Sequence, residues 1–273
     1  MSWFDKILKP KEITLSNGKV VLQPRSKAIP ILILVILFSY FSVGLTGFDL
    51  KILMNRGQEF FVLLVEMFPP DWAYSSRVWG PLLDTIKMSL FGTFLGGFLA
   101  VPFAIIASSN LMKNRLIIIL ARLIISFLRT FPTLVIALLA TFIFGLGTVA
   151  GTTAITLFTF SYLGKLLYEF IETVDMGPYE AMEAMGLGKL KAFIVSIIPQ
   201  VFPIYMSNVL YCFEGNVRHA AILGYVGAGG IGLILNERLA WREYDSVGMI
   251  LVLLFVAVLI IETTSRYIRS KLV

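Results

Sequence analysis

Long apolar segments separated by short polar connections dominate the chain. A helix needs about 20 mainly apolar residues to cross the hydrocarbon core of a bilayer. Six segments come close to that length, although some are interrupted by proline, glycine or a charge. The pattern predicts an all-α polytopic membrane protein with about six transmembrane helices, at roughly 28–48, 82–107, 130–147, 152–170, 201–223 and 247–267.

Two stretches outside these segments are polar or amphipathic. Residues 1–27 are rich in lysine and predict a cytoplasmic N-terminal tail, in which Ile13 to Leu22 could form a small hairpin around Asn17-Gly18. Residues 49–80 mix apolar and charged side chains and are too charged to span. We expect them to lie along the outer membrane interface, within a transmembrane domain of residues 28–273.

The second and third spans carry further signals. Gly92, Gly96 and Gly97 in the second span would let a neighbouring helix approach closely. The apolar run from Leu116 to Gly147 is too long for one crossing. It therefore predicts an interfacial segment up to Arg129 followed by a span from about Thr130.

Composition and charge support a membrane protein. The chain is 58% hydrophobic, with a mean hydropathy of +0.85 and a net charge of +6. Its basic residues flank the spans and would lie on one side if the N-terminus is inside, which is the usual orientation bias. We therefore expect a multi-pass protein of the plasma (inner) membrane with both termini in the cytoplasm. We expect it to contact membrane lipid and not to bind nucleic acid.

Signals for enzymatic chemistry are weak. The chain has no GxxxxGK[ST] phosphate-binding loop, one histidine and one cysteine, Cys212. Gly227-x-Gly229-x-x-Gly232 has the spacing of a dinucleotide fingerprint but follows a membrane helix, so we reject it as a cofactor site. We expect no catalytic residues, no metal and no cofactor on this chain.

A polar stretch between the fourth and fifth spans, residues 175–203, has the signals of a short capped helix. Gly177-Pro178 suits a helix start, Glu180 lies near its positive end, and Gly186 can end it in a left-handed conformation. A second helix would start near Gly188. The distribution of basic residues along the chain predicts that this stretch lies on the cytoplasmic side. The residues alone leave it open whether it contacts a partner or only connects two spans.

The fifth span contains the polar cluster whose burial in a membrane would cost the most free energy. Glu214 and Arg218 are four residues apart in the order that favours an ion pair, and Asn216 and His219 lie beside them. Charges at membrane depth usually face a cavity or a partner. Two interpretations remain open: a structural ion pair, or a passage for an anion in which Glu214 holds Arg218 in place.

A glycine-rich break follows the fifth span. Gly227, Gly229, Gly230 and Gly232 fall within the sequence GYVGAGGIG. Such glycines favour a broken helix or a tight re-entrant loop near a gate.

These motifs resemble a known family. Glu180-Ala181, Gly186 and the later Pro199 resemble the "EAA" loop of ABC-importer permeases, with Met182 in place of the third alanine. The blocks FPPD, RTFP, FEGNVR and VGAGGIG are similar to the phosphonate-uptake permeases, and the resemblance covers nearly all of residues 28–273.

The resemblance implies a type I importer with two copies of this permease, a cytoplasmic ABC ATPase dimer that holds ATP and Mg, and an extracytoplasmic substrate-binding protein. Residues 175–199 would be the coupling loop. Its contact residues would be Glu180, Ala181, Met182, Ala184 and Gly186. The substrate would be phosphonate, phosphite, hypophosphite or a phosphate ester.

Two other functions stay open on the sequence. One is an ABC permease for another small solute, such as an amino acid or a metal chelate. The other is an ATPase-independent channel or proton-coupled carrier that uses Glu214 and Arg218.

Overall fold

The computed structural model describes residues 11–14, 18–23 and 28–272. It divides into two compact units, Met1–Val62 and Leu63–Val273. In the first unit, strands β1 (Lys11–Thr14) and β2 (Val20–Gln23) pair antiparallel, with Lys11 opposite Gln23. The hairpin predicted over residues 13–22 is therefore confirmed, although Asn17 at its turn lies outside the described residues.

The apolar helix α2 (Ala28–Thr46) has the length and surface expected of a membrane span. Its 19 residues would extend about 28 Å, and large side chains such as Phe38 and Tyr40 are exposed along it. The amphipathic helix α3 (Leu50–Glu66) follows after a bend of 71° and buries none of its residues.

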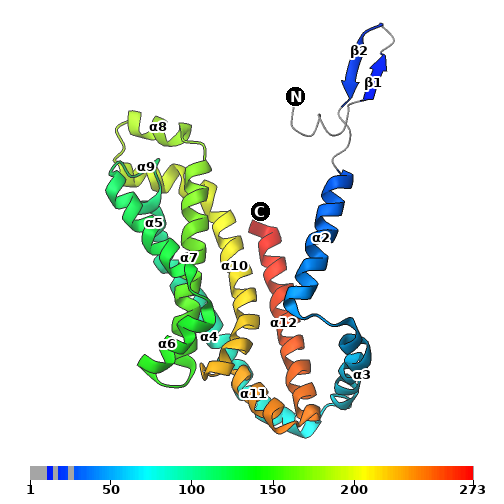
Figure 1. Cartoon of the computed structure of the whole chain (residues 1–273). Helices are drawn as coiled ribbons and strands as arrows, with labels where there is room; N and C mark the ends of the chain where they lie inside the picture. The colour runs from blue at the N-terminus through cyan, green and yellow to red at the C-terminus, as the bar shows by residue number, and fades with distance from the viewer. Residues whose placement is uncertain (1–10, 15–17, 24–27, 273) are drawn as a thin grey trace. The chain divides into compact units, whose positions relative to one another are not determined.

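The second unit is a bundle of helices (Figure 1). α8 and α9 lie at one end of the bundle and α11 lies at the opposite end. The elements are η1 (Trp72–Tyr74), α4 (Ser75–Ala107), α5 (Arg115–Thr130), α6 (Thr133–Phe144), α7 (Thr148–Thr173), α8 (Gly177–Ala184), α9 (Lys189–Ser196), α10 (Ile198–Leu223), η2 (Gly224–Val226), α11 (Ile231–Trp241) and α12 (Tyr244–Leu272).

Glycines bring α4 and α7 into close contact, as predicted. A Cβ on Gly92 would lie 2.6 Å from Ile155 Cγ2, and one on Gly96 would lie 2.6 Å from the Thr156 carbonyl oxygen. Gly97 faces α10 instead, and its carbonyl accepts a 2.7 Å hydrogen bond from the Tyr205 hydroxyl. Small residues at these positions therefore let α7 and α10 pack closely against α4.

The break predicted near Arg129 is present, and the third predicted span is α6, a helix of 12 residues. The chain breaks at Phe131-Pro132 into α5 and α6, which are inclined at 92° to each other. Proline disfavours a helical conformation in the residue before it, and Phe131 is extended with ψ 128°. The segment before Arg129, predicted to be interfacial, is helix α5, and it packs into the bundle by burying Ala121 and Ile125.

The predicted fold class is confirmed. Within the described residues, three helices are long and apolar enough to cross a membrane alone, and three bent pairs raise the number to six if each pair is one span. The predicted start of the second span was too late, because α4 begins at Ser75. The 49–80 stretch is thus divided among α3, η1 and the first turns of α4.

Candidate functional site

The helix predicted after residue 176 is present as α8. The Asp175 carboxylate accepts a 3.0 Å hydrogen bond from the Gly177 amide, and Pro178 occupies the first turn. Gly186 has φ +86°, and the Leu187 amide donates to the Met182 carbonyl at 3.1 Å. This is the glycine-terminated helix end expected from the sequence.

One face of α8 is exposed, and the other packs against the helical bundle. Glu180, Ala181, Ala184 and Gly186 are exposed, whereas Met182 is half-buried. Met185, just after the helix, is 66% exposed. On the inner face, the Tyr179 ring is buried in the core shared with α4, α5, α7 and α10.

Tyr179 and Gln200 hold this segment to the bundle. The Tyr179 hydroxyl donates to the Glu183 carboxylate at 3.3 Å, and burial followed by the Glu183 charge raises the pKa of Tyr179. The Gln200 side chain donates to the carbonyls of Asp175 and Ser196 at 3.2 and 2.7 Å. α8 is therefore a locally fixed element with an exposed face.

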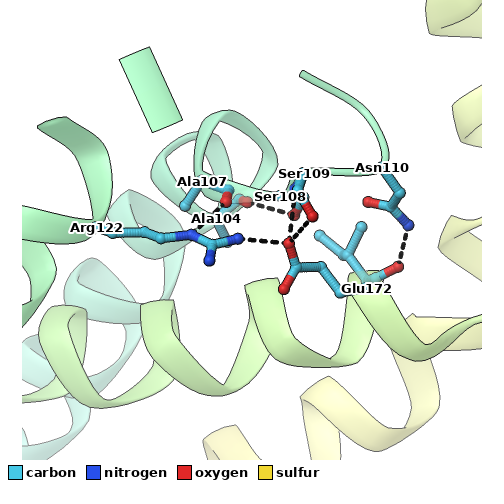
Figure 2. Close-up of polar contacts among 8 residues, drawn as sticks. Ala104, Ala107, Ser108, Ser109, Asn110, Arg122 and Glu172 are labelled. Carbon is cyan, nitrogen blue, oxygen red and sulfur yellow. Dashed lines mark hydrogen bonds and ion pairs between the residues drawn. The ribbon is translucent and has the colours of Figure 1, made fainter. Parts of the chain in front are cut away.

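A polar network that the sequence analysis missed joins three helices near α8. Figure 2 shows Glu172, near the end of α7, between Arg122 of α5 and Ser109 in the α4–α5 connection. Arg122 Nε also donates to the Ala107 carbonyl at 2.9 Å, and Asn110 donates to the Ile171 carbonyl at 2.6 Å. The one sequence signal for this network was Arg122, a charged residue inside an apolar run. This network ties α4, α5 and α7 together two residues before the α7–α8 connection.

The predicted ion pair in α10 is present and extends to a third residue. Arg218 lies 2.7 Å from one Glu214 carboxylate oxygen, and Arg269 of α12 lies 3.2 Å from the other. The Glu214 side chain is 6% exposed, compared with 51% for Arg218. Arg269 also lies over the Tyr211 ring, 5.6 Å from its centroid. The sequence analysis did not assign Arg269 to this cluster.

Asn216 and His219 have different surroundings. Asn216 is buried, and its amide donates to the hydroxyls of Thr93 and Thr159 at 2.8 and 2.9 Å, so it links α4, α7 and α10. His219 is exposed and packs edge-on against Phe158. Both residues line a pocket of about 390 Å³ between α7 and α10, together with Phe158, Tyr162, Tyr211, Cys212, Gly215 and Arg218.

The glycine-rich break connects α10 to α11. Gly227, Gly229 and Gly230 have positive φ values of 75°, 80° and 72°. The Gly227 carbonyl accepts a 2.9 Å hydrogen bond from the Gly147 amide, and Thr85 accepts a 2.7 Å hydrogen bond from the Ile231 amide. The break therefore packs against the α6–α7 connection and α4, at the end of the bundle that contains α11.

Gly232 is expected to be intolerant of even a methyl group. A Cβ there would collide with the Ala221 carbonyl oxygen, where the start of α11 crosses the end of α10. Overpacking of this kind costs about 1–3 kcal/mol, so Gly232→Ala should lower the thermal unfolding temperature of the detergent-purified protein. Gly215→Ala in α10 is the matched control, because nothing lies within 4 Å of its added Cβ. Equal unfolding temperatures for the two variants would contradict the packing described.

The fold and the sequence both match known transporters. Residues 100–271 match the family described as "Binding-protein-dependent transport system inner membrane component". The chain resembles the permease of the MetNI methionine ABC transporter with a TM-score of 0.63 and 19% identity, covering 72% of this chain and 96% of that one. Together with the helical bundle, this likeness shows a type I ABC importer permease fold.

Two relatives are closer in sequence. The putative phosphite transport system permease protein HtxE of Stutzerimonas stutzeri is 40% identical over 209 residues, which cover 77% of this chain and 80% of the relative. The phosphate-import permease protein PhnE of Mycolicibacterium smegmatis is 34% identical over 212 residues. That match covers 77% of this chain but only 40% of the relative's length. With the family match and the shared fold, these likenesses show that the chain belongs to the binding-protein-dependent transport system inner membrane components.

Proposed function

We propose that this chain is the permease subunit of an ABC importer that moves phosphonate or a related phosphorus oxyanion, such as phosphite, hypophosphite or a phosphate ester, into the cytoplasm. The observation that carries the substrate class is the 40% identity to a putative phosphite permease over 80% of its length. The Arg218 and His219 side chains beside an open pocket support it, since a cationic group suits an anion.

α8 is the proposed contact with a cytoplasmic ABC ATPase dimer, which would hold ATP and Mg. The residues that would meet the ATPase surface are the exposed Glu180, Ala181, Ala184 and Gly186 and the half-buried Met182. Because Tyr179 and Gln200 fix α8 to the bundle, motion imposed on it would pass to α7 and α10. The charge bias supports a cytoplasmic location for α8 and for both termini.

A second copy of the chain completes the proposed permease. The Arg218 side chain is 51% exposed in the single chain, and a charge at membrane depth is costly when it faces lipid. Covering this face with an identical chain places Arg218 in a shared passage, as a two-fold homodimer would. The glycines of the α10–α11 break would form a gate on the side facing an extracytoplasmic substrate-binding protein.

Co-purification followed by ATPase measurements tests this proposal. The chain should purify with a partner ABC ATPase and a substrate-binding protein, and loaded binding protein should stimulate ATP hydrolysis. Phosphite or methylphosphonate should stimulate, and methionine should not. Stimulation by methionine alone would contradict the substrate class, and a chain that binds no ATPase would contradict the importer assignment.

A further inference from the structure

A second pocket adjoins the one beside Arg218 and His219. It has a volume of about 370 Å³ and lies where α5 ends, α6 begins and α7 passes. The two pockets share Phe158 and Tyr162, whose rings stack with centroids 6.0 Å apart. They therefore lie on either side of one aromatic pair near the middle of α7.

Each pocket contributes an arginine. Arg218 lines the first pocket and Arg129 of the RTFP sequence lines the second. Glu214 neutralises Arg218 in part, because it contacts that residue at 2.7 Å. Arg129 is exposed, and within the described part of the chain it has no carboxylate within ion-pair distance.

The lining of both pockets favours anions over cations. No aspartate or glutamate is among the described residues that line either one. Thr130, Thr133 and Ser161 also line the second pocket, although the Thr130 and Ser161 hydroxyls donate to the carbonyls of Phe127 and Phe158. α6 begins at this pocket, at Thr133, without a side-chain cap. The N-terminal end of the α6 dipole adds partial positive charge to the side already occupied by Arg129.

We propose that the two pockets form one anion-binding groove, in which Arg129 and Arg218 each offer a guanidinium to a small phosphorus oxyanion as it passes along the Phe158–Tyr162 pair. The inference rests on the proposed function and adds Arg129 as a substrate-binding residue. A planar guanidinium matches two oxygens of a tetrahedral oxyanion at once. The bend at Pro132 then has a role, because it brings the end of α5 and the start of α6 to the same pocket.

Transport by a reconstituted complex with its ATPase and binding protein tests the role of Arg129. Arg129→Gln should reduce phosphite uptake about tenfold or more, because it removes charge-assisted hydrogen bonds. Assembly and ATP hydrolysis without binding protein should stay at wild-type levels. Arg115→Gln, an exposed arginine at the other end of α5, is the matched control and should leave uptake unchanged.

A second readout does not depend on transport. In a Cys212→Ser background, Thr130→Cys places one thiol in the second pocket. An anionic methanethiosulfonate should react faster than a cationic one, relative to their reactivity with a free thiol in solution. Phosphite should slow the reaction, and Arg129→Gln should remove the preference for the anionic reagent.

The outcomes separate the two proposals. If the wild-type complex imports phosphite and the Arg129→Gln variant imports it equally well, the proposed anion-binding groove is overturned but the importer assignment is not. A thiol at residue 130 that shows no anion preference also overturns the groove. A wild-type complex that imports no phosphorus oxyanion overturns the proposed function, and the substrate assignment of the groove falls with it.

Discussion

Replacing Gly186 by valine is expected to reduce ATP-driven uptake to the level of a complex without ATP. Gly186 has φ +86°, where a β-branched residue is strained, and this conformation directs the Leu187 amide to the Met182 carbonyl. Forcing valine into the left-handed region costs about 1–2 kcal/mol or more. The chain would then leave that conformation and tilt the end of α8 away from its partner surface.

Gly188→Val is the matched control for this experiment. Gly188 is also exposed in the same connection, but its φ of −65° and ψ of 148° suit valine. Gly186→Asn should retain part of the uptake, since asparagine tolerates the left-handed region. Uptake measured in proteoliposomes should therefore rank wild type and Gly188→Val together, Gly186→Asn below them and Gly186→Val last. Equal uptake by the Gly186→Val and Gly188→Val variants would contradict the proposal that α8 couples ATP hydrolysis to transport.

Replacing Glu214 by glutamine is expected to destabilise the protein by about 1–3 kcal/mol, less than for a fully buried ion pair because Arg218 and Arg269 are partly exposed. Its carboxylate is buried between Arg218 of α10 and Arg269 of α12. Without that charge, the partly buried Arg269 would lose the carboxylate that it contacts. The thermal unfolding temperature in detergent should therefore drop clearly below that of the wild type.

Glu262→Gln provides the comparison. Glu262 pairs with Arg266 in the same i,i+4 spacing, but both side chains are exposed at 38% and 73%. Exposed pairs contribute only about 0.2–1 kcal/mol, so this variant should unfold close to wild type. Adding Arg269→Gln to Glu214→Gln should recover part of the lost stability, because it removes the unpaired charge. A Glu214→Gln protein as stable as Glu262→Gln would show that the three-residue cluster contributes little.

Local signals in the sequence predicted α8 well. A proline at the helix start, a glutamate in its first turn and a glycine at its end act within a few residues, so their effects can be inferred without the fold. The same holds for Gly92 and Gly96, because a run of small residues in an apolar helix has few other uses.

Contacts between distant segments were harder to predict. Arg269 lies 55 residues from Glu214 in the chain, and nothing in a basic C-terminal helix end indicates which carboxylate it will meet. Glu172 and Arg122 are 50 residues apart and pose the same difficulty. The packing of α5 was also hard to predict, because Arg122 contacts Glu172 and Tyr168, which both lie in α7.

Uptake of phosphite into proteoliposomes, with and without the partner ATPase, tests the central claim most directly. The complex of this chain with the ATPase and the loaded binding protein should accumulate phosphite only when ATP is present on the ATPase side. The chain reconstituted without the ATPase should accumulate none. Accumulation by the chain alone would contradict the account and favour a self-contained carrier. A fully assembled complex that hydrolyses ATP yet imports no phosphorus oxyanion would contradict the proposed substrate.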